Sequence, residues 1–436
     1  MRERVLKEAV ICTLRQIPDM SSLDGLRRAR TPQIRKLLAW LDQSGLALYF
    51  FANLRKHRAL DQIPRLLRVE LEARLKSNQA RTRDMLEEFE RIVTAFIRKD
   101  VRFCALKGFT LCPDFCPTVD LRHQTDFDFF VAPESLPAAK QVLRSFGYSL
   151  NTVGQSNDLT FETPLHHIPS AKDDIYAIPR HREVDLVTSS SALLNIDSHG
   201  VSFSGDSNCI ALHHPQTKNL AGISFPALPV QDAFCVQVLH AFRHLLGSWV
   251  RASWLLEISN FINRHFGDDM LWREIAAQVG NDSKMRNAFG VITSLTNALF
   301  HSPLPEALSD WCLRPLPPRI ESWVAQFGMK TALSGLDGSK LTLFVQREFV
   351  DDPASWPAYV RQRLFPVGRQ SSVGIPTTGD PGARMTSRVS QWRHSFRRAA
   401  FHAGELFSLP VDAIRWKYAL HSIDKRRILV SPVQAR

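Results

Sequence analysis

The spacing of apolar residues predicts that the first hundred residues are helical. The clearest stripe recurs every three to four positions over residues 85–97, with charged residues on the other faces. This is the period of a helix that buries one side. We expect it to end near Lys99 and Asp100. The stripe consists of Met85, Leu86, Phe89, Ile92, Val93, Phe96 and Ile97.

The period changes after residue 100. Residues 101–106 are almost continuously apolar, as expected of a strand that is covered on both faces. Residues 101–147 as a whole predict a unit of strand, helix, strand and helix. Its parts are Val101–Leu106 ending at Lys107-Gly108, Phe109–Phe115, Asp126–Val131, and Ser135–Phe146 stopping at Gly147.

The pattern of apolar and polar residues divides the rest of the chain into further regions. Residues 150–230 lack a helical period, and residues 182–187 alternate charged and apolar positions like a half-exposed strand. Helical spacing then returns, and a stretch rich in Gly, Pro, Ser and Thr comes after it. We expect an α+β fold in which a small mixed sheet is flanked by mainly helical regions. The predicted divisions are an N-terminal helical region (1–100), an α/β core (101–230), a helical domain (231–365), a linker (366–387) and a basic amphipathic helical tail (388–436).

The net charge of +12 is concentrated in the tail. From residue 361 onward there are fourteen Arg and Lys residues and only four acidic ones. In the tail, Val389, Trp392, Phe396 and Ala400 share one helical face among arginines. This pattern fits binding of RNA or an anionic membrane surface. It also fits a helix that packs this stripe onto the body, with its arginines in solvent.

Other features indicate a cytoplasmic location. No apolar stretch reaches the roughly 18 residues that a transmembrane helix needs, and the N-terminus lacks the apolar segment of a secretory signal. The seven cysteines are scattered and odd in number, which favours reduced thiols.

Asp126 and Asp128 are the most informative pair of residues. Alternate side chains of a strand share a face, so both carboxylates point one way while Phe127, Phe129 and Val131 point into a core. Two carboxylates this close repel each other, and a divalent cation that also binds phosphate is a common way to stabilise them. The alternative is a solvated strand edge whose acids serve solubility.

Several motifs in order resemble the uncharacterised bacterial nucleotidyltransferase family of the polymerase-β-type superfamily. The motifs include Lys107-Gly108, Arg122 followed by Asp126-x-Asp128, Glu183-Val184-Asp185, Gly147-Tyr148, the segment from His240 to His244, Trp254 to Ile258, and Leu364-Phe365-Pro366. The resemblance implies a small mixed sheet with three carboxylates at its exposed edge. It also implies transfer of a nucleoside monophosphate from a nucleoside triphosphate, for which we expect ATP, to a hydroxyl group with two Mg²⁺ ions.

The resemblance assigns roles to these residues. Asp126 and Asp128 would hold both metals, and Asp185 would be the third acid, holding the catalytic metal and helping to deprotonate the hydroxyl. Glu183 lies on the same strand face and is the rival for that role.

Phosphate binding would fall to residues upstream of the strand. Gly108 lets backbone amides approach phosphate, and Lys107 would bind the β- or γ-phosphate unless it simply lies in solvent. Arg122 would contact the triphosphate or pair with Asp126.

A later segment adds further candidates. His240 and His244 lie one helical turn apart, but no glutamate follows His240, so the zinc protease motif is absent. They are interpreted as packing or pocket-lining residues. Arg251, Trp249 and Trp254 either pack over a nucleobase or belong to the core.

The sequence is consistent with two alternative functions. The first is a magnesium-dependent nucleotidyltransferase whose acceptor is a metabolite, a peptide or protein side chain, or an RNA end. The second is a binding or scaffold protein that keeps the fold without turnover, because fold and activity separate freely.

Overall fold

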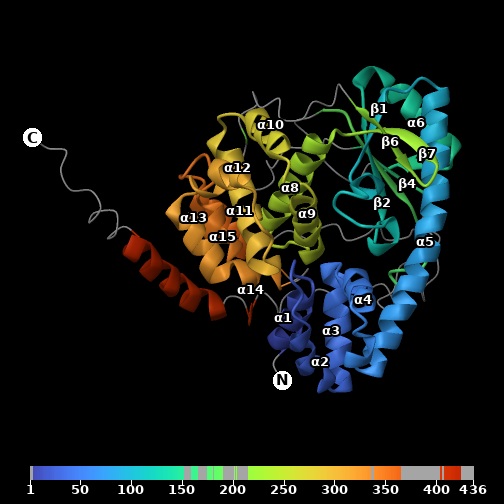
Figure 1. Ribbon diagram of the computed structural model, residues 1–436. Coiled ribbons are helices and arrows are strands. Elements are labelled where there is room, and N and C mark those ends of the chain that lie inside the picture. The colour runs from blue at the N-terminus through green and yellow to red at the C-terminus, as the bar shows by residue number, and fades with distance from the viewer. Residues whose placement is uncertain are drawn as a thin grey trace, which may run out of the picture.

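A computed structural model of the 436-residue chain provides the structure. It describes residues 3–151, 159–164, 174–179, 181–189, 201, 203, 215–334, 338–364, 403–404 and 407–423. Figure 1 shows the sheet on one side of the molecule, with the N-terminal helices below it and the C-terminal helices on the opposite side.

The N-terminal region is helical, and its last helix runs along the sheet (Figure 1). This 34-residue helix, α5, buries the predicted stripe from Met85 to Phe96 and ends at Arg98, one residue before the predicted boundary. The helices before it are short and pack into one core with the C-terminal helices. Their bounds are α1 (Glu3–Thr13), α2 (Asp24–Arg27), α3 (Thr31–Ser44), α4 (Ala47–Lys56) and α5 (Arg65–Arg98).

The prediction that Ile97 is buried with the rest of the stripe was wrong. Ile97 is 55% exposed, whereas Phe96 is fully buried. At about 100° per residue, Ile97 is rotated roughly 80° away from Phe89, so it lies at the margin of the apolar face in the last turn.

Within the described residues, seven strands form one mixed sheet in the order β3-β4-β5-β2-β1-β7-β6. The β2–β5 and β1–β7 pairs are parallel, and the other pairs are antiparallel. The strands are β1 (Phe103–Leu106), β2 (Asp126–Val131), β3 (Ser149–Leu150), β4 (Leu159–Glu162), β5 (Glu183–Val187), β6 (Gln216–Leu220) and β7 (Ile223–Ala227). The α+β prediction is confirmed.

The two faces of the sheet pack into different cores. Phe127, Phe129 and Val131 of β2 belong to a core shared with α5 and α6 (Leu136–Ser145), as the alternation predicted. Phe130 points the other way, into the larger core that contains the N-terminal and C-terminal helices. Because Asp126 and Asp128 alternate with the phenylalanines, they lie on the same face as Phe130, toward the helical body.

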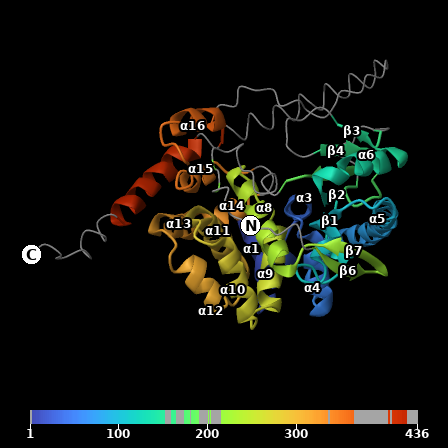
Figure 2. The ribbon, with the colours of Figure 1, turned by 90° about the horizontal axis from the view of Figure 1, so that it is seen from above.

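The C-terminal half of the chain is helical. Helices α8 and α9 lie between the sheet and the remaining helices in Figure 1, and Figure 2 shows the same order from above. These helices are α8 (Val230–Leu246), α9 (Ala252–Arg264), α10 (Asp269–Val279), α11 (Ser283–Phe300), α12 (Glu306–Leu308), α13 (Pro318–Trp323), α14 (Met329–Ala332), α15 (Thr342–Gln346) and α16 (Trp356–Leu364).

Part of the predicted tail packs on this helical body. Within the helix over residues 407–423, Trp416 is only 7% exposed and stacks on Phe344, while Asp412 accepts a 2.8 Å hydrogen bond from Lys330. The predicted linker and the stripe from Val389 to Ala400 lie outside the described residues. No helix in the described ranges has both the length and the apolar character that crossing a membrane requires.

Candidate active site

Three aspartates from two neighbouring strands converge on the sheet face that meets the helical body. Asp126 and Asp128 come from β2, and Asp185 comes from β5. One carboxylate oxygen of each lies within 4.8 Å of the others. Carboxylate oxygens are hard ligands of the kind that Mg²⁺ prefers, so this donor set fits a divalent cation.

The parallel register of β2 and β5 produces this arrangement. Asp128 lies opposite Asp185, and Asp126 lies opposite Glu183. Both acids of β5 therefore share the face of the β2 pair, as the sequence predicted. The carboxylate of Glu183 instead lies 3.5 Å from His181 Nε2, in a separate group with Glu162.

Burial and mutual repulsion shape the protonation of the triad. Burial raises the pKa of Asp185 to about 7. The nearby charges of Asp128 and Asp126 add to this rise, whereas a hydrogen bond from Thr160 opposes it. Burial and the neighbouring Asp128 also raise the pKa of Asp126. Near neutral pH, Asp185 therefore holds a proton part of the time unless a cation stabilises the charge of the triad.

Lys107 supplies one positive charge to the triad. Its Nζ lies 2.9 Å from Asp128 Oδ1. Burial alone would lower the pKa of Lys107, but the contact with Asp128, together with the charges of Asp126 and Asp185, outweighs burial and raises it. Among the residues that the structure describes, Asp126 and Asp185 make no ion pair at all, so one of three carboxylates is neutralised.

The Lys107-Gly108 turn has a strained backbone. The φ angles are +45° at Lys107 and +50° at Gly108, a region that favours glycine. A Cβ at residue 108 would lie 2.6 Å from the side-chain nitrogen of Gln124. The positive φ therefore favours a glycine where the chain leaves β1 beside the triad. The predicted helix after it is a 3₁₀ turn, Gly108–Leu111.

Arg122 pairs with Glu257 of α9 instead of Asp126. Its Nε lies 3.2 Å from Glu257 Oε1, and Glu257 is 1% exposed. The same carboxylate accepts hydrogen bonds from Tyr49 and Gln237, each at 3.0 Å. Glu257 thereby holds the guanidinium of Arg122 near Asp126.

The Glu257→Gln substitution tests this arrangement. It leaves the buried Arg122 without its counter-charge, so we expect the free energy of unfolding to fall by on the order of 3 kcal/mol. Urea unfolding measures the change, with Glu90→Gln on the exposed face of α5 as the matched control. Equal midpoints for the two variants would contradict the role of Glu257.

The remaining predicted residues line the same region from α8 and α9. The rings of His240 and His244 are 4.5 Å apart and contact Trp254, as expected of packing residues. Burial, with Lys107 next in effect, lowers the pKa of His240 well below its usual value, so this ring is neutral. Arg251 lies 5.7 Å from the Trp254 ring, and its buried Nε has no hydrogen-bond partner among the described residues.

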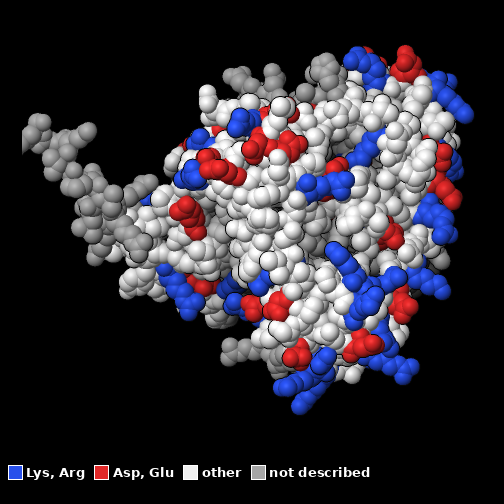
Figure 3. All heavy atoms as spheres, viewed as in Figure 1, with Lys and Arg blue, Asp and Glu red and all other residues white. Residues whose placement is uncertain are grey.

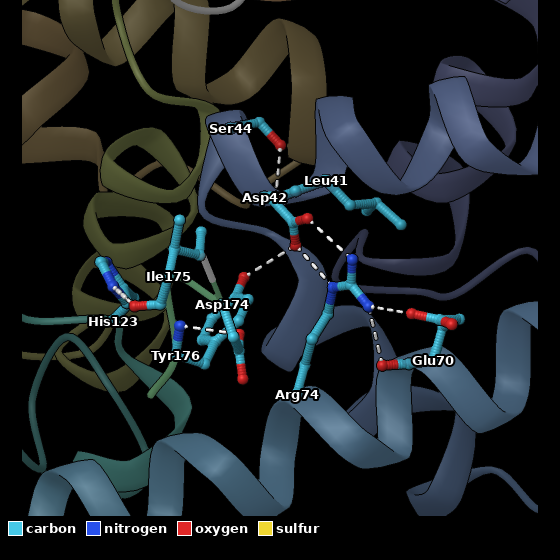
Figure 4. A network of polar contacts seen from close by, with 9 residues as sticks. All are labelled: Leu41, Asp42, Ser44, Glu70, Arg74, His123, Asp174, Ile175 and Tyr176. Carbon is cyan, nitrogen blue, oxygen red and sulfur yellow. Dashed lines mark hydrogen bonds and ion pairs between the residues drawn. The ribbon is translucent and has the colours of Figure 1, made fainter. Parts of the chain in front are cut away.

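A polar network ties the N-terminal helices to the segment before β5 (Figure 4). Asp42 of α3 forms a bidentate pair with Arg74 of α5 and accepts a 3.1 Å hydrogen bond from Tyr176. The backbone carbonyl of Ile175 lies 2.7 Å from Nε2 of His123, the neighbour of Arg122. Burial lowers the pKa of His123 to about 3, so this ring also stays neutral. The network places the N-terminal helices next to the candidate site.

The sequence of this chain matches one protein family over residues 31–301, which is more than half of its length. That family is described as uncharacterised nucleotidyltransferases. The chain belongs to this family. The resemblance found in the motifs is thus confirmed at the level of the family. No curated protein matched the chain.

Sequence reasoning missed several residues of this candidate site. Thr160 donates a 2.7 Å hydrogen bond to Asp185, and Gln124 packs on Gly108. Glu257 holds Arg122 from 135 positions away. For Thr160, the alternation in Leu159–Glu162 was the available signal, whereas nothing local marks Glu257 as a partner of Arg122.

Proposed function

We infer that this chain is a magnesium-dependent nucleotidyltransferase that moves a nucleoside monophosphate from a nucleoside triphosphate, preferably ATP, to a hydroxyl group of an acceptor. The bond between the α- and β-phosphates breaks, and pyrophosphate is released. The observation that carries this proposal is the convergence of Asp126, Asp128 and Asp185 within 4.8 Å. A family of nucleotidyltransferases supplies the reaction class. The acceptor is a metabolite, a peptide or protein side chain, or an RNA end.

The three acids would have different roles as metal ligands. Asp126 and Asp128 would hold two Mg²⁺ ions, and Asp185 would hold the ion at the acceptor. When bound, the ions supply charge stabilisation to the attacking and leaving oxygens. Thr160 occupies Oδ1 of Asp185, which leaves Oδ2 to bind the ion or to accept the proton of the acceptor hydroxyl.

Basic residues around the triad would bind the triphosphate. Lys107, already 2.9 Å from Asp128, is placed to neutralise phosphate charge beside the ions. Arg122 is oriented by Glu257, and the Nε donor of Arg251 is unused among the described residues. The Lys107-Gly108 turn brings backbone close to the same position.

The basic tail supports an additional anionic partner, either an RNA or a membrane surface. Figure 3 shows basic and acidic side chains mixed over α5 and the N-terminal helices on one face. By contrast, the segment after residue 361 is strongly basic. Within this segment, the exposed side chains of Phe407, Val411, Ile414 and Tyr418 add apolar surface.

Magnesium-dependent nucleotide binding separates the enzyme from a non-catalytic scaffold. We expect saturating ATP to raise the melting temperature by a few degrees in Mg²⁺ and to have little effect in EDTA, because the ions connect the triad to the phosphates. Thermal unfolding of the full chain measures the shift. The Asp128→Ala variant is expected to lose it. Stabilisation that is equal in EDTA, or no stabilisation in Mg²⁺, would favour the scaffold.

A further inference from the structure

A second group of metal-ligating side chains lies on the same sheet face as the aspartate triad. Glu162 of β4 is directly opposite Glu183 of β5, and His181 precedes Glu183 by two residues. His181 Nε2 lies 3.5 Å from Glu183 Oε1 and 3.8 Å from Glu162 Oε2. The three ligand atoms all lie within 4.8 Å of one another.

These separations suit a shared ion. A tetrahedral zinc ion with bond lengths of about 2.1 Å places its ligand atoms roughly 3.4 Å apart. Both distances from His181 Nε2 are within about 0.5 Å of that value. Two carboxylates and one imidazole also carry a net negative charge that a divalent cation would neutralise.

Two of the three ligands are oriented by outer partners. His181 Nδ1 lies 2.8 Å from the carbonyl oxygen of Thr163, which can only accept, so Nδ1 carries the proton and Nε2 faces the carboxylates. Asn151 Nδ2 donates a 2.6 Å hydrogen bond to Glu162 Oε1, and this leaves Oε2 toward His181. Such outer hydrogen bonds are typical of metal ligands.

The backbone beneath the group is fixed as well. Arg182, between His181 and Glu183, points to the opposite side and pairs with Asp84 and Glu88 of α5, with Glu88 at 3.1 Å. Thr163 and Arg182 exchange two further hydrogen bonds, at 2.9 and 3.0 Å. Because these contacts hold residues 181–183 in place, the ligands are preorganised.

We propose that Glu162, His181 and Glu183 form a second divalent cation site that is distinct from the aspartate triad and selective for a transition metal such as Zn²⁺. The triad offers only carboxylates, which suit Mg²⁺, whereas an imidazole ligand favours zinc and its neighbours in the periodic table. The two sites share no ligand. An ion here would link β4 to β5 beside the triad, because Glu183 lies directly opposite Asp126 and two residues before Asp185.

Cobalt titration of the metal-free full chain tests the site, with Co²⁺ as a visible probe of zinc sites. We expect one equivalent to bind with the absorption bands of a site that contains one imidazole, and Zn²⁺ to displace it. His181→Gln should weaken this binding by at least about tenfold, as should Glu162→Gln. Asp128→Asn should leave the bands unchanged, so failure of the proposed transferase activity would not affect this result.

The matched control is His57→Gln, which removes an exposed histidine at the end of α4. Circular dichroism of each variant verifies folding, and the conservative Glu162→Gln keeps the test valid should His181→Gln fail to fold. Imidazole-type cobalt absorption bands that are unaffected by both substitutions would overturn the proposal. So would absence of binding by the wild type, since His181 would then be only an ion-pair partner of the two glutamates.

Discussion

Replacing Asp126 with asparagine is expected to reduce nucleotide transfer on the order of 10³-fold or more while leaving the fold intact. The carboxylate belongs to the triad and pairs with no basic residue in the described part of the chain, so its removal leaves no orphaned cation. The reason for the slower transfer is that the variant would lose a ligand of both ions. A 10³-fold slower reaction corresponds to about 4 kcal/mol less transition-state stabilisation. Incorporation of labelled nucleotide into an acceptor from a cell extract measures the loss.

The control for this prediction is Asp61→Asn, which makes the same chemical change at a side chain that is 93% exposed. It should retain full transfer. Residual transfer by Asp126→Asn within tenfold of that control would exclude Asp126 as a ligand of the catalytic ions.

Asp185→Asn should have opposite effects on activity and on stability. Activity should fall at least about a hundredfold because the third ligand is lost. In EDTA at pH 8, however, the variant should be more stable than the wild type by on the order of 2 to 4 kcal/mol. The reason is that the pKa of Asp185 in the folded protein, about 7, lies above its usual value of 3.8.

The pH dependence of stability has the same origin. Between about pH 4 and pH 7 the folded chain binds more protons at Asp185 than the unfolded chain, so this group makes stability fall as the pH rises. Asparagine does not titrate and removes this contribution. Urea unfolding at pH 5 and pH 8 measures how steeply the free energy of unfolding changes with pH in the wild type and in Asp185→Asn. Identical slopes for the wild type and Asp185→Asn would show that Asp185 titrates normally.

The sequence predicted the parts of the site that depend on strand alternation. Asp126 and Asp128 alternate with buried phenylalanines, and this local pattern was sufficient to place both on one face. It could not decide between Asp185 and Glu183, because residues two apart share a face. The roles of these two acids are distinguished only by the structure. The register with β2 places Asp185 opposite Asp128, and the carboxylate of Glu183 lies near His181 instead.

Contacts between distant segments could not be predicted. Lys107 reaches Asp128 because β1 and β2 are antiparallel neighbours with Leu106 opposite Asp128. Arg122 meets Glu257 only because α9 packs beside the segment that precedes β2. Similarly, the group of Glu162, His181 and Glu183 requires the β4–β5 register, which a strand of four residues does not reveal by itself.

The most direct test of nucleotidyl transfer compares two positions of the label on ATP. The full chain, Mg²⁺ and a cell extract are incubated with ATP labelled at the α- or the γ-phosphate, alongside the Asp126→Ala/Asp128→Ala protein. The triad predicts that α-label becomes attached to one acceptor, that γ-label does not, and that the double variant attaches neither. Attachment of γ-label, or equal attachment of α-label by the double variant, would contradict nucleotidyl transfer by the three aspartates.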